Sequence, residues 1–435
     1  MTRWSPKGGL LGLGDPPGPP PAQSPLVDPF GGRFNEGLPR PTDGLLDIPR
    51  ARRWFRAIAW GVREDLYTFQ QPLEAQSGPH VTRAGRRCIM LSSYDYLGLI
   101  GDPRIDEAAT AAIARYGTGS GGVRLLTGST ALHAELEGAI ADFLGVEAAI
   151  AFASGYMANQ GVLSALLGAG DLVLVDAYAH RSIQDGCRLS GAEIESFAHN
   201  DMDELRRRLG ARPRRRRTLI VAEGLYSMDG DICPLPDLVA LKQEFGAFLM
   251  IDEAHSLGVL GPTGRGVTEH FALPATAVDV TTGSLSKAMP ANGGFVAGRR
   301  DLVFYLQHGA GPFFFSAALC PAATAAATAA IQVLRAEPER LARQRANGTR
   351  LRAGLRALGF DTGRSDSPLV PVILESDERA YRAARDLLDE GVVASAVVFP
   401  AVARGAARLR LCATAAHSPE DIDAALDAFA RIRPT

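Results

Sequence analysis

Among the residues that could react with a small molecule, Lys287 stands out because lysine is so rare in this chain. Lys7, Lys242 and Lys287 are the only lysines among 46 basic residues, and the rest are arginine. Lys287 lies in a loop of small residues that follows a predicted strand over 278–282. A primary amine can form a Schiff base with an aldehyde, whereas a guanidinium cannot. Taken alone, Lys287 also fits a surface lysine without a function.

An acidic residue lies at the end of the neighbouring predicted strand. Residues 247–251 form an apolar run that predicts a buried parallel strand, and Asp252 follows it directly. Open α/β sheets bind their ligands at the carboxyl ends of such strands. An amine that can bind an aldehyde and a carboxylate that can pair with a pyridine nitrogen are what a pyridoxal phosphate site needs. Lys287 and Asp252 together therefore predict pyridoxal 5'-phosphate as the cofactor.

Four more candidate residues follow predicted strands. Gly155 and Tyr156 open a predicted helix, where free amide groups can bind a phosphate and Tyr156 can stack on an aromatic ring. His180 and Ser227 each lie a few residues past the end of another strand. Each residue alone also fits a structural role, for example Tyr156 as a packed aromatic residue. Their shared position at strand ends favours one common site.

The elements that must position these residues alternate between short strands and helices from about residue 148 to 300. This order is typical of a mainly parallel sheet covered by helices, so we predict an α/β fold with a second, smaller α/β unit behind it. The predicted strands are 148–153, 171–176, 193–197, 218–222, 247–251, 278–282 and 294–297. The predicted parts are 1–45, a disordered Pro- and Gly-rich arm; 46–100, a helix and strand segment; 101–335, the large cofactor-binding domain; and 336–435, the small C-terminal domain.

Composition and charge indicate which partners, metals and cellular location to expect. A net charge of −2 gives no general attraction to nucleic acid or anionic membranes, and we expect neither as a partner. Five scattered cysteines without a CxxC pair argue against a disulfide framework or a zinc site, so we expect no metal and a reducing, cytoplasmic location. We also expect no signal peptide, because no basic region followed by an apolar one opens the chain.

Three segments carry weaker signals. Residues 313–334 are uncharged and long enough to cross a bilayer, but they contain Pro321 and are mostly alanine. We predict a buried helix at a domain or subunit interface there, and no transmembrane segment. The glycine-rich stretch 117–128 could hold a phosphate, although it lacks the Lys-Ser/Thr ending of a P-loop. The basic run 212–217 could bind an anion or nucleic acid, but we interpret it as a solvated loop.

Several motifs together resemble the α-oxoamine synthases, a fold-type I pyridoxal-phosphate family. The similarity extends from about Leu91 to the C-terminus. The motifs are Ser-Gly-Tyr-Met-Ala-Asn at 154–159, His-x-Ser-Ile-x-Asp-Gly at 180–186, Glu-Gly-x-Tyr-Ser-Met-Asp-Gly-Asp at 223–231, Asp-Glu-Ala-His-Ser at 252–256, Ser-Lys at 286–287 and Arg-Leu-Arg at 408–410. The resemblance implies an aspartate aminotransferase-like fold, with a large, mainly parallel-sheet domain and a smaller C-terminal α/β domain. It also implies a homodimer with shared active sites.

The resemblance assigns a role to each residue around the cofactor ring. Lys287 would form the Schiff base, Asp252 would pair with the pyridine nitrogen, and His255 would reach the ring hydroxyl. His180 would stack on the ring face and help polarise the thioester carbonyl of the second substrate. We therefore expect Lys287, His180 and Asp252 to be the catalytic residues.

The resemblance also assigns residues to the phosphate and to the substrate. The amides of Gly155 and Tyr156 and the hydroxyl of Ser284 would hold the phosphate, which Ser316 would reach from the partner subunit. Arg410 would bind the carboxylate of the amino acid. The expected substrate-binding residues are Tyr94, Asp95, Ser227 and Arg410.

The implied activity is the decarboxylative condensation of an amino acid with an acyl thioester of CoA or an acyl carrier protein. We expect a serine palmitoyltransferase-like enzyme of sphingolipid biosynthesis, because the segments 93–98, 185–188 and 313–316 are similar to that enzyme. The segment 397–400 carries valine where some relatives carry arginine, which predicts an apolar wall and a long acyl chain. The alternatives are an 8-amino-7-oxononanoate synthase, another α-oxoamine synthase, or an inactive partner subunit, against which the retained Lys287 argues.

Overall fold

The computed structural model describes residues 44–212 and 216–432 of the chain. The predicted arm over 1–45 therefore lies almost wholly outside the described residues, and so does the middle of the basic run over 212–217.

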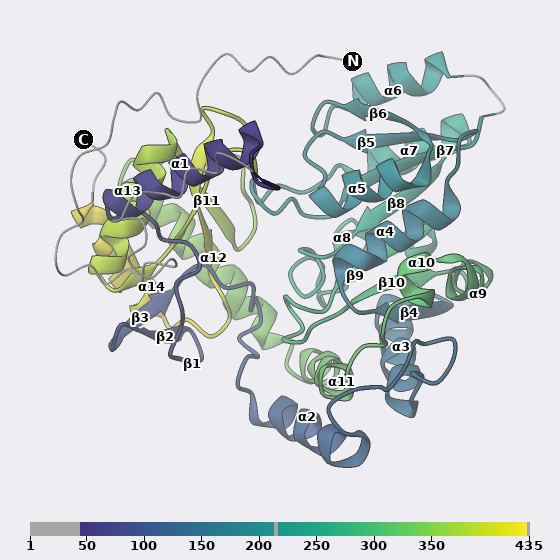
Figure 1. Ribbon diagram of the computed structural model, residues 1–435, viewed down its shortest axis with the longest axis horizontal. Coiled ribbons are helices and arrows are strands. Elements are labelled where there is room, and N and C mark those ends of the chain that lie inside the picture. Colours follow the sequence, from purple (N-terminus) through teal and green to yellow (C-terminus); the bar gives the residue numbers. More distant parts are fainter. Residues whose placement is uncertain (1–43, 213–215, 433–435) are drawn as a thin grey trace.

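A seven-stranded sheet forms the centre of the larger part of the molecule (Figure 1). Its strand order is β4-β10-β9-β8-β7-β5-β6; β10 runs antiparallel to both neighbours, and the other pairs are parallel. The strands are β4 (Ala148–Phe152), β5 (Leu172–Asp176), β6 (Glu193–Phe197), β7 (Thr218–Glu223), β8 (Phe248–Asp252), β9 (Val280–Ser284) and β10 (Gly294–Gly298). All seven agree with the predicted strands to within two residues at each end, so the predicted α/β fold is confirmed.

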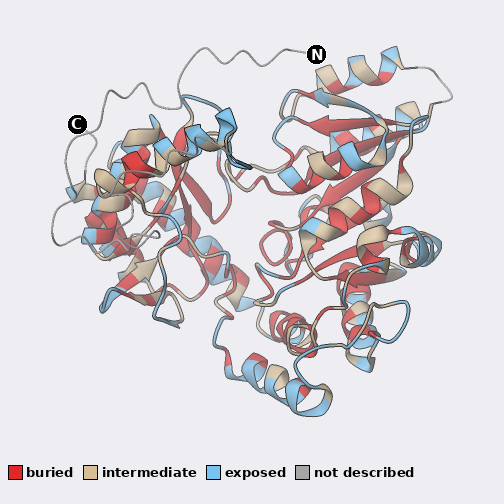
Figure 2. Cartoon of the chain, viewed as in Figure 1, coloured by how far each residue is buried: buried red, intermediate tan, exposed pale blue. Residues whose placement is uncertain are grey.

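Helices cover both faces of this sheet, which explains why its central strands are apolar along their whole length. In β5, Leu172 and Leu174 belong to one buried cluster, whereas Val173 and Val175 belong to another on the opposite face. Figure 2 shows β5, β7 and β8 as buried from end to end, apart from the first residue of β8. The first face is covered by α2 (Pro103–Tyr116), α3 (Ala131–Leu144), α6 (Met202–Ala211), α7 (Leu235–Phe245) and α11 (Pro321–Ala336). The second face is covered by α4 (Gly155–Leu166), α5 (Arg181–Ser190), α9 (Arg300–Gly309) and α10 (Gly311–Phe314). Between β8 and β9 lie the short helix α8 (Val267–His270) and a 3-10 turn, Ala275–Ala277.

The smaller part of the molecule, at the left of Figure 1, combines both ends of the described chain. Strand β3 (Arg86–Met90) pairs in parallel with β12 (Val392–Val393), so the 46–100 segment shares a sheet with the C-terminal part. A second sheet has the order β11-β14-β13 and carries Arg410 on its middle strand. The remaining elements here are α1 (Pro49–Arg63), β1 (Ala75–Ser77), β2 (His80–Arg83), α12 (Glu339–Ala357), β11 (Leu369–Glu375), α13 (Asp377–Asp389), β13 (Ser395–Val397), β14 (Ala407–Cys412) and α14 (Pro419–Arg431).

We expected one buried helix over the uncharged segment 313–334, but the structure divides this segment into two helices. Helix α10 ends at Phe314, a loop follows, and α11 begins only at Pro321, whose ring suits the first turn of a helix. One side of α11 is buried against α2 and α3. Among the described residues, we find no helix that combines the length and the hydropathy needed to span a membrane.

Candidate active site

The predicted cofactor residues meet in a hollow at the carboxyl ends of the central strands. The hollow has a volume of about 410 Å³ and lies where β7, β8 and β9 end and α4 begins. Its lining consists of Ala153, Ser154, Gly155, Tyr156, Asn159, His180, Ser182, Glu223, Asp252, Ala254, His255, Ser284, Ser286, Lys287, Asn292 and Gly293. Seven of the eight predicted cofactor-binding residues are in this set; Ser316 is not.

Asp252 is held in place by donors to both of its oxygens. It is the last residue of β8 and is 5% exposed. The side-chain amide of Asn159 donates to Oδ2 at 2.7 Å, and the backbone amide of Ala254 donates to Oδ1 at 2.9 Å. Asn159 is itself fixed, because its Oδ1 accepts a hydrogen bond from the Thr282 hydroxyl at 2.7 Å. The carboxylate therefore faces the hollow in one defined orientation.

Lys287 follows β9 and presents its amine to the same hollow. Burial lowers the pKa of Lys287; the carboxylates of Asp252 and Glu223 oppose this effect, and Arg410 adds to it. The net result is a lowered pKa, so a larger share of the side chain is unprotonated near neutral pH. The unprotonated amine is the form that attacks an aldehyde or accepts a proton.

His180 is fixed at both its ring and its backbone. It is the N-cap residue of α5, where its Nδ1 atom accepts the Ser182 amide hydrogen at 3.2 Å and lies 2.7 Å from the Ser182 hydroxyl. Its own backbone amide donates to the carboxylate of Glu223. Burial lowers the pKa of His180, with Asp252 opposing and Lys287 adding to the effect. A neutral ring whose Nδ1 is an acceptor carries its hydrogen on Nε2.

His255 is also a neutral histidine with one defined tautomer. Burial lowers its pKa well below the usual range, and the positive charges of Lys287 and Arg410 add to this. Its Nδ1 lies 2.6 Å from the Tyr96 hydroxyl, which also accepts from Arg410 Nη2 at 3.3 Å. Tyr96 therefore donates to Nδ1, and the Nε2–H of His255 is left to donate to a ligand in the hollow.

The amino end of α4 forms a cradle that fits a phosphate. The Ser154 hydroxyl accepts from the Met157 amide at 3.2 Å, while the Gly155 and Tyr156 amides come first in the helix and have no intrahelical acceptor. The Ser284 hydroxyl lies on the neighbouring strand end. A Cβ on Gly155 would lie 3.2 Å from the Gly283 carbonyl and from Ser284 Cβ, so glycine lets the two segments approach. The donor set and the close approach both fit the phosphate of pyridoxal phosphate.

Arg410 is 5% exposed and does not line the hollow, but it lies close enough to Lys287 and His255, which do, for its charge to lower their pKa values. Its Nε donates to the Ser227 carbonyl at 2.7 Å, and its guanidinium carbon lies 4.8 Å from the centre of the Tyr94 ring. The same ring lies 5.9 Å from Lys287 Nζ. Nη1 of Arg410 has no hydrogen-bond partner in residues 44–212 and 216–432, so it can still donate to a ligand oxygen. The neighbouring Arg408 is not available, because it binds Asp229 and the Met228 carbonyl.

The five predicted site residues that do not line the hollow are Tyr94, Asp95, Ser227, Arg410 and Ser316. Both oxygens of Asp95 accept backbone amides, those of Leu99 at 2.7 Å and Ile100 at 3.1 Å, and the side chain is buried. Asp95 therefore holds its own loop, and its expected contact with the substrate stays a prediction. Ser316 lies in the loop after α10, outside the lining of the hollow.

Sequence reasoning gave no role to Asn159, Glu223 or Tyr96, although each holds a site residue. Asn159 lies four residues after Gly155, one helical turn on, and therefore faces the same side of α4. Glu223 is the last residue of β7, the same position that singled out Asp252. These two signals were present in the sequence. The contact of Tyr96 with His255 joins residues 159 positions apart and had no local signal.

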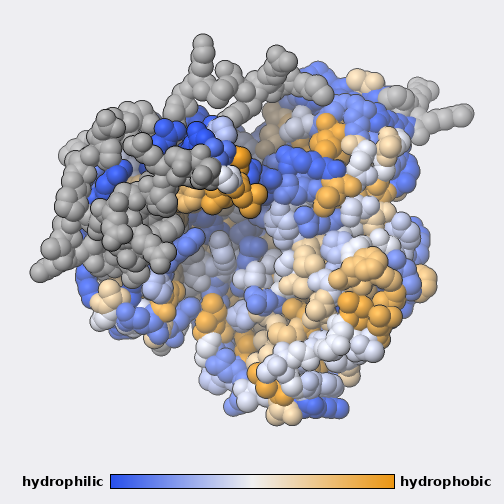
Figure 3. All heavy atoms as spheres, viewed as in Figure 1, coloured by the Kyte–Doolittle hydropathy of each residue, from blue (hydrophilic) through white to orange (hydrophobic). Residues whose placement is uncertain are grey.

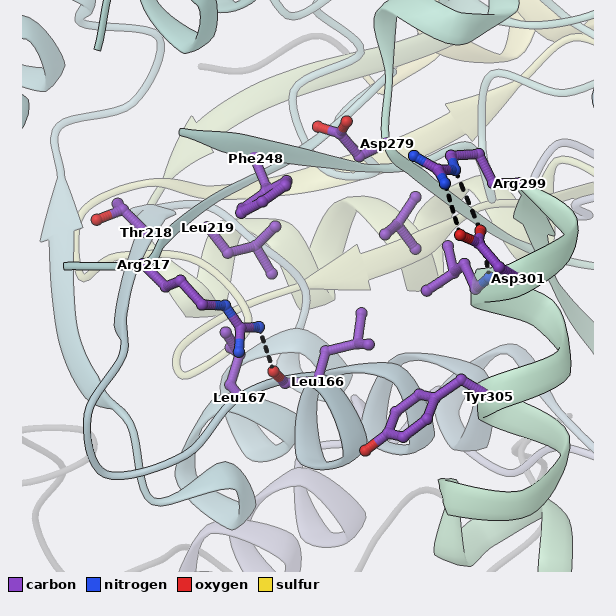
Figure 4. Close-up of a pocket in the computed structure, with 12 residues that line it drawn as sticks. Leu166, Leu167, Arg217, Thr218, Leu219, Phe248, Asp279, Arg299, Asp301 and Tyr305 are labelled. Atoms are coloured by element: carbon purple, nitrogen blue, oxygen red, sulfur yellow. Dashed lines mark hydrogen bonds and ion pairs between the residues drawn. The ribbon is translucent and has the colours of Figure 1, made fainter. Parts of the chain in front are cut away.

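Figure 4 shows a second hollow, of about 360 Å³, at the opposite edge of the sheet. It is lined by Thr218, Phe248 and Val280, which begin β7, β8 and β9, whereas Asp252 and Ser284 end β8 and β9. None of the predicted site residues, all of which are in the described part of the chain, lines it. The chemistry therefore belongs to the first hollow.

Comparison with known proteins agrees with this geometry. Residues 86–429 match the family model described as aminotransferase class I and II. The 8-amino-7-oxononanoate synthase of Symbiobacterium thermophilum is 46% identical over 368 residues, covering 84% of this chain and 94% of that protein. The serine palmitoyltransferase of Sphingobacterium spiritivorum is 39% identical over 367 residues, covering 84% and 92%. A serine palmitoyltransferase from S. paucimobilis, solved with PLP and myriocin bound, superposes with a TM-score of 0.82 at 38% identity and covers 84% and 92%.

The fold and the hollow define a pyridoxal-phosphate enzyme of fold type I. The chain belongs to the class I and II aminotransferase family, and within it to the α-oxoamine synthases. Its cofactor is pyridoxal phosphate, and its substrates are an amino acid and an acyl thioester, so it is an acyltransferase.

Proposed function

We propose that this α-oxoamine synthase makes 8-amino-7-oxononanoate, the product in the name of several relatives, by condensing alanine with a pimeloyl thioester. The name 8-amino-7-oxononanoate shows which part of the product comes from each substrate. The C7 ketone of the nine-carbon acid is the former thioester carbon of a pimeloyl chain, and C8 and C9 are Cα and Cβ of alanine after its carboxylate is lost. The observation that carries the proposal is that relatives of this name are 40–46% identical over more than four-fifths of the chain. The proposal therefore replaces serine palmitoyltransferase as the first choice.

The segment 397–400 gives less support to a long acyl chain than its sequence suggested. Val398 packs against the buried cluster of the small domain, so it is not simply an apolar wall open to substrate. In the same hairpin, the guanidinium of Arg404 lies 4.4 Å from the centre of the Phe399 ring. This loop therefore carries a cation of its own, which is compatible with an acyl chain that ends in a carboxylate.

Each residue of the hollow would have its own role in the reaction. Pyridoxal phosphate, when bound, supplies an aldehyde for primary amines and a ring that withdraws electrons from the substrate Cα. Asp252, fixed by Asn159, would face the pyridine nitrogen and keep it protonated. Lys287, with its lowered pKa, would carry the cofactor and then hold or release a proton at Nζ. The Nε2–H of His180 would polarise the thioester carbonyl.

The substrate would be oriented by residues that lie near the hollow without lining it. Arg410, supported by the Ser227 carbonyl, would receive the carboxylate of the amino acid on its remaining donors. The Tyr94 ring, which lies near both Arg410 and Lys287, would cover that position and exclude water. Ser227 takes part through its carbonyl in this arrangement, and its hydroxyl is a further proposed contact.

We also propose that two copies of the chain share their active sites. Ser316 is the predicted cofactor residue that does not line its own hollow, as expected of a residue that acts on a partner. Apolar side chains gather on the surface over α9 and α10, next to Ser316 in the chain (Figure 3). Phe304 and Phe315 there are 64% and 81% exposed, which supports burial against a second subunit. The five cysteines, all unpaired, support the cytoplasm as the proposed location.

A second candidate is the condensation of serine with a long-chain acyl thioester, a first step toward a sphingolipid. The valine in segment 397–400 favours it, and so does the structural likeness to serine palmitoyltransferases. An experiment separates the two candidates directly. The purified holoenzyme is incubated with alanine, serine or glycine and with pimeloyl-CoA or palmitoyl-CoA, and the product is weighed by mass spectrometry.

The expected product is 8-amino-7-oxononanoate, with the highest kcat/KM for pimeloyl-CoA and alanine. Lys287→Arg is the control that must give no product with any pair. Faster turnover of palmitoyl-CoA with serine would move the enzyme to the second candidate. Turnover of neither thioester by a chain that binds pyridoxal phosphate would contradict both assignments.

A further inference from the structure

A histidine outside the hollow lies between two carboxylates at the carboxyl edge of the central sheet. Nδ1 of His199 is 2.9 Å from Asp176 Oδ1, and Nε2 is 2.7 Å from Asp231 Oδ2. The Tyr178 ring stacks on the imidazole at 4.2 Å, and the Tyr226 ring meets it edge-on at 4.4 Å. We call these five residues the His199 cluster.

The His199 cluster joins two loops that carry site residues. The first loop begins after β5, where Asp176 accepts the Tyr178 amide at 2.8 Å, and reaches His180 two residues later. The second loop follows β7 and folds back on itself, so that the Tyr226 amide donates to the Asp231 carbonyl at 3.0 Å. This second loop contains the Ser227 carbonyl, which accepts a hydrogen bond from Arg410 Nε.

The surroundings of His199 favour its charged form. With both ring nitrogens beside carboxylates, only the imidazolium can donate to both. Burial alone would lower the pKa of His199, but its hydrogen bonds and attraction to Asp176 and Asp231 outweigh this and raise it to about 9. The other groups that face the ring are Tyr178 and Tyr226, with the Asn200 amide at its edge.

Two buried polar atoms of the His199 cluster have no hydrogen-bond partner among the described residues. They are the Tyr226 hydroxyl oxygen and Asp231 Oδ1. Removing the cation from this place would leave Asp176 and Asp231 without the two N–H donors and the positive charge that lie between them. The two loops would then lose the contact that fixes one relative to the other.

We propose that His199 is a positioning residue, which as a cation between Asp176 and Asp231 holds the His180 loop and the Ser227 loop in register. It thereby sets where His180 and Arg410 meet the amino-acid substrate, without touching substrate or cofactor itself. This inference rests on the proposed roles of His180 and Arg410.

The test compares His199→Gln with His80→Gln in the holoenzyme. His80 is a matched control, because its Nε2 lies 2.8 Å from Asp421 and its side chain is 18% exposed against 16% for His199, yet it lies on β2 in the smaller part of the molecule. Four quantities are measured for each variant: thermal stability, bound cofactor from its absorbance, amino-acid Kd from titration of that absorbance, and kcat. Asp231→Asn removes the ion pair with His199 by changing the carboxylate instead of the imidazole. It replaces His199→Gln in the test if that variant does not fold.

We expect His199→Gln and Asp231→Asn to keep their cofactor, while the amino-acid Kd rises and kcat falls by about tenfold to a hundredfold, as for a misplaced substrate. The double variant should be no worse than the worse single variant, because both break one contact. His80→Gln should match wild type in Kd and kcat. If the His199 and Asp231 variants lose stability but keep a wild-type Kd and kcat, His199 is a purely structural residue and the proposal fails. If wild type itself does not bind an amino acid, the proposed function fails instead.

Discussion

Asn159 provides a sharp test of how the fold holds the cofactor site. It is 2% exposed, and its side chain makes hydrogen bonds to Asp252, Ser182 and Thr282 at 2.7, 2.9 and 2.7 Å. The change Asn159→Ala removes all of them and adds no charge. It should therefore weaken the folded state and also free the Asp252 carboxylate to rotate away from the pyridine nitrogen.

The magnitude follows from the partners that are lost. A buried hydrogen bond to a charged group is worth about 2 kcal/mol, and each neutral one about 1 kcal/mol. Asn159→Ala should then destabilise the apoenzyme by about 4 kcal/mol. Its cofactor affinity should fall by about tenfold or more, which corresponds to about 1.4 kcal/mol.

Asn347 supplies a matched control. It is a buried asparagine in the small domain, whose side chain donates to the carbonyls of Thr414 at 2.9 Å and His417 at 2.8 Å. Asn347→Ala should destabilise the chain by about 2 kcal/mol and leave cofactor affinity unchanged. Urea unfolding of the apoenzyme gives the first quantity, and titration with pyridoxal phosphate gives the second. Equal cofactor affinity in Asn159→Ala and wild type, or an equal loss in Asn347→Ala, would refute the role given to Asn159.

Three further predictions concern the amine, the arginine and the buried imidazolium. Lys287→Arg should fold, bind the cofactor non-covalently and lose turnover by several orders of magnitude, as product assays of the reconstituted enzyme would show; substantial turnover would mean that another residue is the base. Arg410→Ala should weaken amino-acid binding by about 2 kcal/mol, roughly 30-fold, and spare cofactor binding; an unchanged titration of the bound chromophore would contradict its role. The pKa of His199 is about 9 in the folded chain against an ordinary 6.5, so its stabilising contribution is fully present below pH 6.5 and is lost as pH rises through 9. At about 1.4 kcal/mol per pH unit of that difference, wild type should lose up to about 3 kcal/mol relative to His199→Gln across this range, and parallel stability curves would contradict the raised pKa.

The strand ends could be predicted from the sequence because both faces of the central sheet are covered. An apolar run such as the one that ends at Asp252 has a clear boundary where the first charge appears, and the sheet places that charge at a ligand edge. The scarcity of lysine then distinguished Lys287 without any structure. Gly155 and His180 followed from the same rule, since each lies within a few residues of the end of a strand.

The residues that hold these side chains depend on contacts that the local sequence does not encode. Tyr96 links Arg410 and His255, which are far from it in the chain and belong to different parts of the fold. Likewise, nothing in the sequence indicated that the carboxylate of Asp95 turns back to the amides of Leu99 and Ile100. The segment 397–400 was judged by one valine, whereas its neighbour Arg404 changes the charge of the same hairpin.

The central claim is that Lys287 carries the cofactor, and reduction with borohydride tests it most directly. The reagent fixes the cofactor to whichever amine holds it, and peptide mapping then identifies the residue. The three lysines, Lys7, Lys242 and Lys287, lie far apart in the sequence, so their peptides are easily told apart. Lys242 is already paired with Asp279 at 2.8 Å, near the amino end of β9 rather than in the hollow. We predict that the label is found on the peptide that contains Lys287. A label on the peptide of Lys242 or Lys7, with none on that of Lys287, would contradict the site described for this enzyme.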